Sequence, residues 1–149
     1  MAIVDLRIGG TTKLPSINPG NHLVLKRTWD ASVDNGDDGD FVKLFNIPAN
    51  TYVIGVFASV TTAEGAASTV DVGDFGGDQD GWIDGLDINA VAVSGSKPGI
   101  LVDGTPNTFL PAFSHGRLYT SAAVISVEVN DDDTDTAVIE FACHCYEVI

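Results

Sequence analysis

Two aspartate-rich loops carry the oxygen ligands that a calcium ion prefers. The first spans residues 34–40 and the second spans residues 74–84. Calcium binds about six to eight oxygens, and glycines let a short loop fold closely around the ion. Aspartate, asparagine and glycine also build ordinary turns between strands. Both interpretations stand, and the sequence favours the turn. The calcium candidates in the second loop are Asp74, Asp78, Asp80 and Asp84.

Part of the second loop has the spacing of an EF-hand. Asp78, Asp80 and Asp84 fall on ligand positions, but the first ligand position falls on Gly76. The flanking residues are typical of strands, whereas an EF-hand loop is flanked by helices. The EF-hand interpretation therefore fails, and only a looser calcium loop remains as an alternative. We expect no cofactor and favour no metal.

Cys143, His144 and Cys145 form a second pattern that is typical of metal ligands. They lie in a strand-like segment, so His144 is expected to point away from the face that carries both thiols. Residues i and i+2 of a strand have Cα atoms about 6.6 to 6.8 Å apart, whereas disulfides prefer about 5.5 to 6 Å. We therefore expect two reduced, buried thiols. The other histidines, His22 and His115, have no evident partner in the sequence.

The charge and the motifs exclude several classes of function. The chain has 149 residues, with 7 Lys and Arg against 21 Asp and Glu, and a net charge of -14. This charge repels phosphate backbones, so no nucleic-acid partner is expected. No apolar run approaches the roughly 18 residues of a membrane span, so no membrane partner is expected either. The chain also lacks the nucleophile elbow, the P-loop and the zinc-protease motif, and we expect no enzyme.

The elements that position these residues are predicted to be strands. Apolar and polar residues alternate over short runs that are separated by breaks rich in Gly, Pro, Asn and Asp. About eight such runs predict one all-β domain over residues 1–149, an antiparallel β-sandwich with a jelly-roll-like arrangement. The expected strands span residues 22–29, 41–47, 51–62, 68–73, 82–93, 118–130 and 136–147, with 3–8 as a further candidate.

The last two runs flank a short polar turn at residues 131–135. Two alternating runs around such a turn predict a β-hairpin. One face of each run is apolar and is expected to be buried. These faces contain Ile125, Val127 and Val129 in the first run and Ile139, Phe141, Cys143 and Cys145 in the second.

The first twenty residues combine an apolar segment with glycines and prolines that favour an extended chain. We interpret residues 1–20 as an N-terminal arm that reaches a partner. Its apolar side chains would add to a neighbour's sheet edge or fill a groove. The alternative is that residues 3–8 form an edge strand of their own domain. The partner-binding candidates are Ile3, Val4, Leu6 and Ile8.

Residues 41–149 resemble a family of small virion proteins of tailed bacteriophages. The shared pattern is a Pro-Ala turn at residues 48–49, a long strand, a Thr-rich turn, the sequence TVDVGD at 69–74 and DQDG at 78–81. The last two runs are similar to the closing hairpin of this family. The resemblance implies a structural protein of the head of the cement or decoration type, without catalysis. It implies the major capsid protein as the partner.

We expect such a protein to bind the exterior of the head as a homotrimer after folding in the bacterial cytoplasm. A strongly acidic chain suits the outside of a shell better than its DNA-facing inside. The alternative is a β-sandwich module, in some cases calcium-dependent, that binds carbohydrate or a receptor through aromatic side chains. Such side chains are Trp29, Trp82, Tyr52, Tyr119 and Tyr146, which lie on or beside strands and are also suited to the core.

Overall fold

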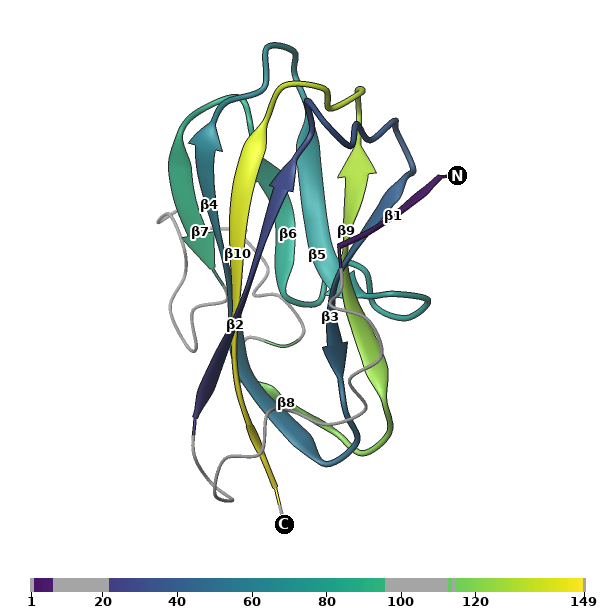
Figure 1. Cartoon of the computed structure of the whole chain (residues 1–149), viewed down its shortest axis with the longest axis vertical. Coiled ribbons are helices and arrows are strands. Elements are labelled where there is room, and N and C mark those ends of the chain that lie inside the picture. The colour runs from purple at the N-terminus through teal and green to yellow at the C-terminus, as the bar shows by residue number, and fades with distance from the viewer. Residues whose placement is uncertain (1, 7–21, 96–112, 114, 149) are drawn as a thin grey trace, which may run out of the picture.

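The computed structural model describes residues 2–6, 22–95, 113 and 115–148. Within these residues, ten strands form two sheets that pack against each other (Figure 1). No helix in the same residues is long and apolar enough to cross a membrane. The strands are β1 (Ile3–Asp5), β2 (Leu23–Asp30), β3 (Phe41–Ile47), β4 (Thr51–Thr62), β5 (Thr69–Asp74), β6 (Ile83–Asp87), β7 (Ala92–Gly95), β8 (Arg117–Tyr119), β9 (Ala123–Asn130) and β10 (Val138–Glu147).

The order of the strands confirms the predicted sandwich and gives it the topology of a jelly roll. One sheet has the order β1-β3-β9-β5-β6, and the other has the order β2-β10-β4-β7, with β8 paired to β4. The chain passes from one sheet to the other after β1, β2, β3, β4, β6, β8 and β9. Without β1 and β8, each sheet has four strands, as expected for the eight strands of a jelly roll. Among the described strands, only β1 pairs in parallel, with β3.

The predicted hairpin between the last two runs is wrong. β9 pairs with β3 and β5, whereas β10 pairs with β2 and β4, so the turn between them crosses from one sheet to the other. Each strand has one apolar face, and that face is buried only if the opposite sheet covers it. A crossing places the two apolar faces against each other, which a hairpin within one sheet does not do.

Two of the predicted runs are each divided into two strands. Residues 118–130 form β8 and β9, which lie in different sheets, with a bend at residues 120–122. Residues 82–93 form β6 and the start of β7, which also lie in different sheets. By contrast, β3 and β4 have the predicted bounds of 41–47 and 51–62. Alternation predicts strands well, but it does not show where a chain leaves one sheet for the other.

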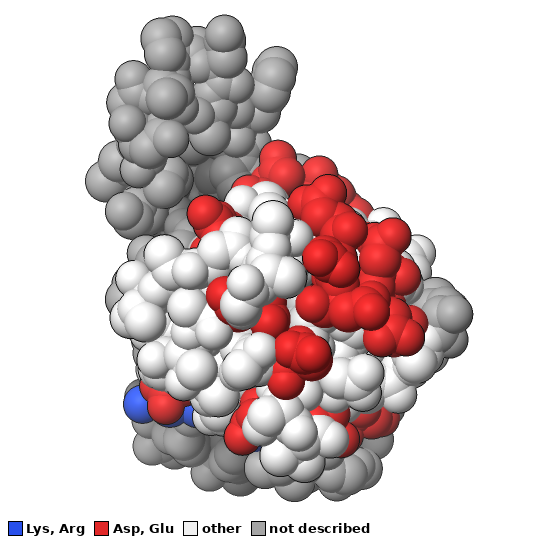
Figure 2. Space-filling view, turned by 90° about the horizontal axis from the view of Figure 1, so that it is seen from above, with Lys and Arg blue, Asp and Glu red and all other residues white. Residues whose placement is uncertain are grey.

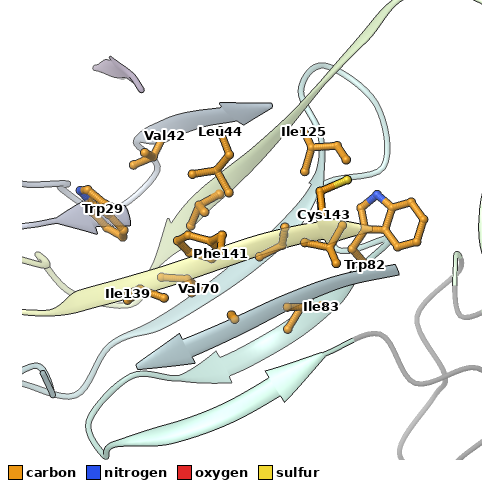
Figure 3. Close-up of a cluster of buried hydrophobic side chains, with 14 of the residues drawn as sticks. Trp29, Val42, Leu44, Val70, Trp82, Ile83, Ile125, Ile139, Phe141 and Cys143 are labelled. Atoms are coloured by element: carbon orange, nitrogen blue, oxygen red, sulfur yellow. The ribbon is translucent and has the colours of Figure 1, made fainter. Parts of the chain in front are cut away.

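The core lies between the two sheets and confirms the predicted inward faces of β9 and β10 (Figure 3). Trp29 and Phe141 lie on the inner side of the β2-β10-β4 sheet, and both are buried. The sulfur of Cys143 packs in the same cluster, close to Trp82 and Ile125 (Figure 3). Burying a large apolar side chain contributes about 1.5 to 3 kcal/mol, so these contacts are a main source of stability.

Candidate interaction surfaces

The N-terminal strand is the first surface that the sequence singled out. Ile3, Val4 and Asp5 pair with Phe41, Val42 and Lys43 of β3, so β1 is the edge strand of its own sheet. The Ile3 side chain is 43% exposed. The partly buried side chains Val4 and Leu6 pack against the core. Ile8 lies outside the described residues.

The carboxylate of Asp74 lies at the centre of a buried polar network. It accepts a hydrogen bond of 2.5 Å from the Tyr119 hydroxyl, and its other oxygen lies 2.7 Å from an Arg117 nitrogen. The indole N–H of Trp82 donates to the Tyr119 oxygen at 3.2 Å. Burial and this contact with Asp74 raise the pKa of Tyr119, which keeps the phenol protonated. Both Asp74 oxygens therefore serve to join β5 to β8.

The other calcium candidates are spread along the same loop. A hydrogen bond with Asp80, burial and the nearby charges of Asp80 and Asp74 raise the pKa of the Asp78 carboxyl. Burial and the charges of Asp71 and Asp80 raise the pKa of Asp84. Among the described residues, no three acidic, histidine or cysteine side chains are placed to hold one metal ion.

A close backbone contact fixes the shape of this loop. The Asp74 N–H donates a hydrogen bond of 2.7 Å to the carbonyl oxygen of Asp78. A Cβ atom on Gly73 would lie 2.1 Å from that oxygen and 2.2 Å from the carbonyl carbon of Gln79. Only glycine lets the strand and the loop approach this closely. The loop is therefore built around β5 by backbone contacts.

Acidic side chains gather at the end of the sandwich that carries the loops after β2, β4 and β9 (Figures 1 and 2). Glu64 is buried there, and its carboxylate accepts backbone hydrogen bonds from Asp135, Thr136 and Ala137 at 2.9 to 3.0 Å. The exposed acids in two of these loops are Asp34, Asp37, Asp38, Asp131, Asp132, Asp133 and Asp135. This end therefore presents a strongly negative surface.

The outer face of the β3-β9-β5-β6 sheet is acidic as well. Glu128 and Asp71 are direct cross-strand partners on β9 and β5. Burial and the charges of Asp71, Asp38 and Asp80 raise the pKa of Glu128. The ammonium of Lys43 lies over the Phe75 ring, 4.2 Å from its centroid. Carboxylates thus outnumber cations on this face, and they repel one another.

The outer face of the β2-β10-β4 sheet carries a cluster of aromatic rings, which sequence reasoning missed. The His22 ring stacks on Tyr146 with centroids 5.2 Å apart, and the His144 ring meets His22 edge-on at the same distance. Tyr146 also contacts Tyr52, with centroids 5.4 Å apart. The pairing of His144 with Val24 on β2 brings His22 close to His144, although they are far apart in the sequence. We call these four residues the aromatic row.

A shallow groove continues this face beyond the aromatic row. Its volume is about 260 Å³, and it is lined by Ala142 of β10 together with residues of β2 and β4. Phe57, which is 38% exposed, forms one wall. The charged residues in its lining are Lys26, Arg27 and Glu140. The groove is therefore part apolar, and its lining carries two cations and one carboxylate.

The burial of the five aromatic candidates for carbohydrate binding shows which of them could contact a sugar. Trp29, Trp82 and Tyr119 are buried in the core and cannot stack on a ligand. Tyr52 and Tyr146 are half-buried and lie in the aromatic row. The Tyr52 hydroxyl donates a hydrogen bond of 2.8 Å to the carbonyl oxygen of His115. Three of the five aromatic candidates therefore belong to the core.

Comparisons with known proteins place the fold among capsid structures. No family model matches the chain, and no curated protein matches it in sequence. The chain is similar to one in the capsid of Ralstonia phage GP4, with 14% identity, a TM-score of 0.69 and coverage of 99% of both chains. It is also similar to one in the capsid asymmetric unit of cyanophage Pam1, with 14% identity and a TM-score of 0.59, over 94% of this chain and 95% of that one. The jelly roll described above is thus shared over nearly its whole length with chains from two phage capsids.

Proposed function

We propose that this chain is a structural protein of a tailed-bacteriophage capsid and acts as a cement protein on the outside of the head. The main support is the match to a chain of the Ralstonia phage GP4 capsid, which covers 99% of both chains. The match therefore concerns the whole sandwich and not one part of it. The resemblance of residues 41–149 to small virion proteins supports the same proposal.

The surface charge supports a location on the exterior of the shell. The net charge is -14, and acids cover one end and one sheet face of the described sandwich. A packaged genome is a dense array of phosphates that repels such a surface. The outside of the head imposes no such cost. In this proposal the chain folds in the host cytoplasm and then joins the virion.

A cement protein acts by binding, without chemistry. If it binds only the assembled lattice of major capsid subunits, mass action shifts the equilibrium away from disassembly. The polar side chains in the described core suit this role, because Asp74 and Glu64 are engaged in holding strands and loops together. Many copies add small free energies over the shell, so each contact is allowed to be weak.

Within this proposal, the N-terminal segment contacts the capsid lattice. β1 lies at the edge of its sheet, and Ile3 is among the most exposed large apolar side chains described. A sheet edge is a natural template for a strand of another subunit. The two four-stranded sheets are complete without β1, so the jelly roll is expected to fold when the segment is removed.

Heat treatment of purified heads tests the proposal. Heads assembled without this chain should break at a lower temperature than complete heads, and adding the purified chain should restore them. A chain lacking residues 1–20 should stay folded but fail to restore them. If heads are equally stable with and without the chain, the cement role is wrong. If the truncated chain restores them fully, the N-terminal contact is wrong.

A further inference from the structure

We propose that copies of this chain bind one another through the outer face of the β2-β10-β4 sheet, with the aromatic row at the rotation axis of the oligomer. This inference rests on the homotrimer in the proposed function and names the surface that forms it. Residues next to a rotation axis contact the same residues of the other copies. A charged group at the axis therefore faces its own charge.

Because like charges would meet at the axis, the acidic surfaces of the described sandwich are excluded as the interface. The end with the β2–β3 and β9–β10 loops carries seven exposed aspartates in those loops, and three copies would bring them together. On the β3-β9-β5-β6 face, burial and then the charges of Asp71, Asp38 and Asp80 already raise the pKa of Glu128 within one copy. A second copy of either surface would add to this repulsion. Neither surface suits self-association at neutral pH.

The outer face of β2, β10 and β4 carries no excess of one charge and can therefore meet its own copies. The charged residues on this face and in its groove are Lys26, Arg27, Asp30 and Glu140, so two cations balance two carboxylates. The same face exposes 53% of Val24, on the strand next to His144. On β8, Leu118 pairs with Tyr52 and is 46% exposed, which extends the apolar surface.

The composition of this face is typical of the centre of a protein interface. Interface centres are depleted in charge and enriched in tyrosine and other aromatic residues. Tyr52, Tyr146, His22 and His144 already contact one another, so their rings lose little freedom when a second copy binds. Val24, Phe57 and Leu118 supply apolar area around them. A basic partner would instead favour the acidic surfaces, so the neutral face is left for a second copy.

A pair of Val→Glu substitutions tests this inference by analytical ultracentrifugation. Val24→Glu places a carboxylate on the proposed interface, whereas Val33→Glu makes the same change in the β2–β3 loop, where Val33 is 75% exposed. We expect the native chain and Val33→Glu to sediment as the same oligomer. Val24→Glu should weaken the association at least tenfold, and added salt should partly restore it because salt screens the new repulsion.

Circular dichroism shows whether each variant is folded, and Thr28→Glu on the same face replaces Val24→Glu if that variant does not fold. The inference is wrong if folded Val24→Glu or Thr28→Glu keeps the native mass, if Val33→Glu dissociates equally, or if the native chain is monomeric at all concentrations. These outcomes do not depend on the capsid. Binding of purified chain to heads, measured separately by co-sedimentation, tests the proposed function, so either idea can fail while the other stands.

Discussion

Glu64 binds Thr136 twice, accepting a hydrogen bond of 2.9 Å from its backbone N–H and one of 2.8 Å from its side-chain hydroxyl. The two residues lie in the loops after β4 and β9, which belong to different sheets. Burial alone would raise the pKa of Glu64, but hydrogen bonds from Thr136, Gly65 and Ala137 lower it from an ordinary 4.5 to about 2. One buried carboxylate therefore holds the acidic end of the sandwich together.

Glu64→Gln should destabilise the protein at neutral pH by about 3 kcal/mol, because a shift of one pKa unit corresponds to about 1.4 kcal/mol. An amide also has only one oxygen to accept the hydrogen bonds. Urea denaturation at pH 7 gives the free energy of unfolding. Glu147→Gln at the exposed end of β10 is the matched control and should change it by less than about 0.5 kcal/mol. Equal stability of the two variants would contradict this role of Glu64.

The difference in stability between the native chain and Glu64→Gln should depend on pH. The folded-state pKa of about 2 lies below the ordinary value of 4.5, so the stabilisation by the carboxylate is complete above pH 4.5. It is lost as the pH falls towards 2. Melting temperatures of both chains between pH 7 and pH 2 should therefore converge on the acidic side. A constant difference over this range would show that the charge of Glu64 is not responsible.

Gly73→Ala should destabilise the protein by about 1 to 3 kcal/mol, the usual cost of overpacking. The added methyl group would collide with the backbone of Asp78 and Gln79, which cannot rotate away as a side chain can. Gly65→Ala is the control, because a Cβ atom there meets nothing within 4 Å. Thermal unfolding of both variants decides the matter. If Gly73→Ala melts together with Gly65→Ala, the loop is not held against β5.

Cys143 and Cys145 should react slowly with a thiol reagent until the protein is unfolded. Both are free and buried, which keeps the reagent away from them. Contact with Cys145 together with burial also raises the pKa of Cys143, whereas the same contact lowers the pKa of Cys145, which burial alone protects. A thiol whose pKa is raised above its ordinary value forms less of the reactive thiolate. Ellman's reagent in buffer and in denaturant measures the two rates. Rapid labelling of both thiols in buffer would be evidence against the packing of β10.

Calcium should leave the melting temperature unchanged. Tyr119 and Arg117 already contact the two oxygens of Asp74, and the positive charge of Arg117 disfavours a second cation there. An ion that binds only the native state would raise the melting temperature according to its concentration. Differential scanning fluorimetry with and without calcium measures this. A rise that Asp80→Ala abolishes would demonstrate a calcium site in the 74–84 loop.

The sequence predicted much of the fold because each strand carries its own apolar alternation. The inward face of β10 is an example, since Ile139, Phe141, Cys143 and Cys145 are all buried as expected. The sheet to which a strand belongs is a different property. It depends on partners far away in the chain, so residues 118–130 were predicted as one strand and form two.

The candidate interface was harder to predict for the same reason. His22 and Tyr146 stack only because β2 pairs with β10 in a particular register, and alternation does not contain this register. Glu64 is similar, since all its hydrogen-bond donors except Gly65 lie about seventy residues away in the chain. For the interaction surfaces, the net charge was a more useful signal than the alternation of apolar residues. The excess of acids predicted a surface unsuited to nucleic acid, and the described surface has one neutral sheet face among acidic ones.

Cryo-electron microscopy of intact heads from the phage that encodes this chain tests the central claim most directly. The cement role predicts that jelly-roll density, into which the present fold can be built, lies on the outer surface of the shell and contacts neighbouring major capsid subunits. Heads from cells in which the gene is deleted should lack this density. Density inside the shell or in the tail, or a complete shell with no place for the chain, would contradict the cement role.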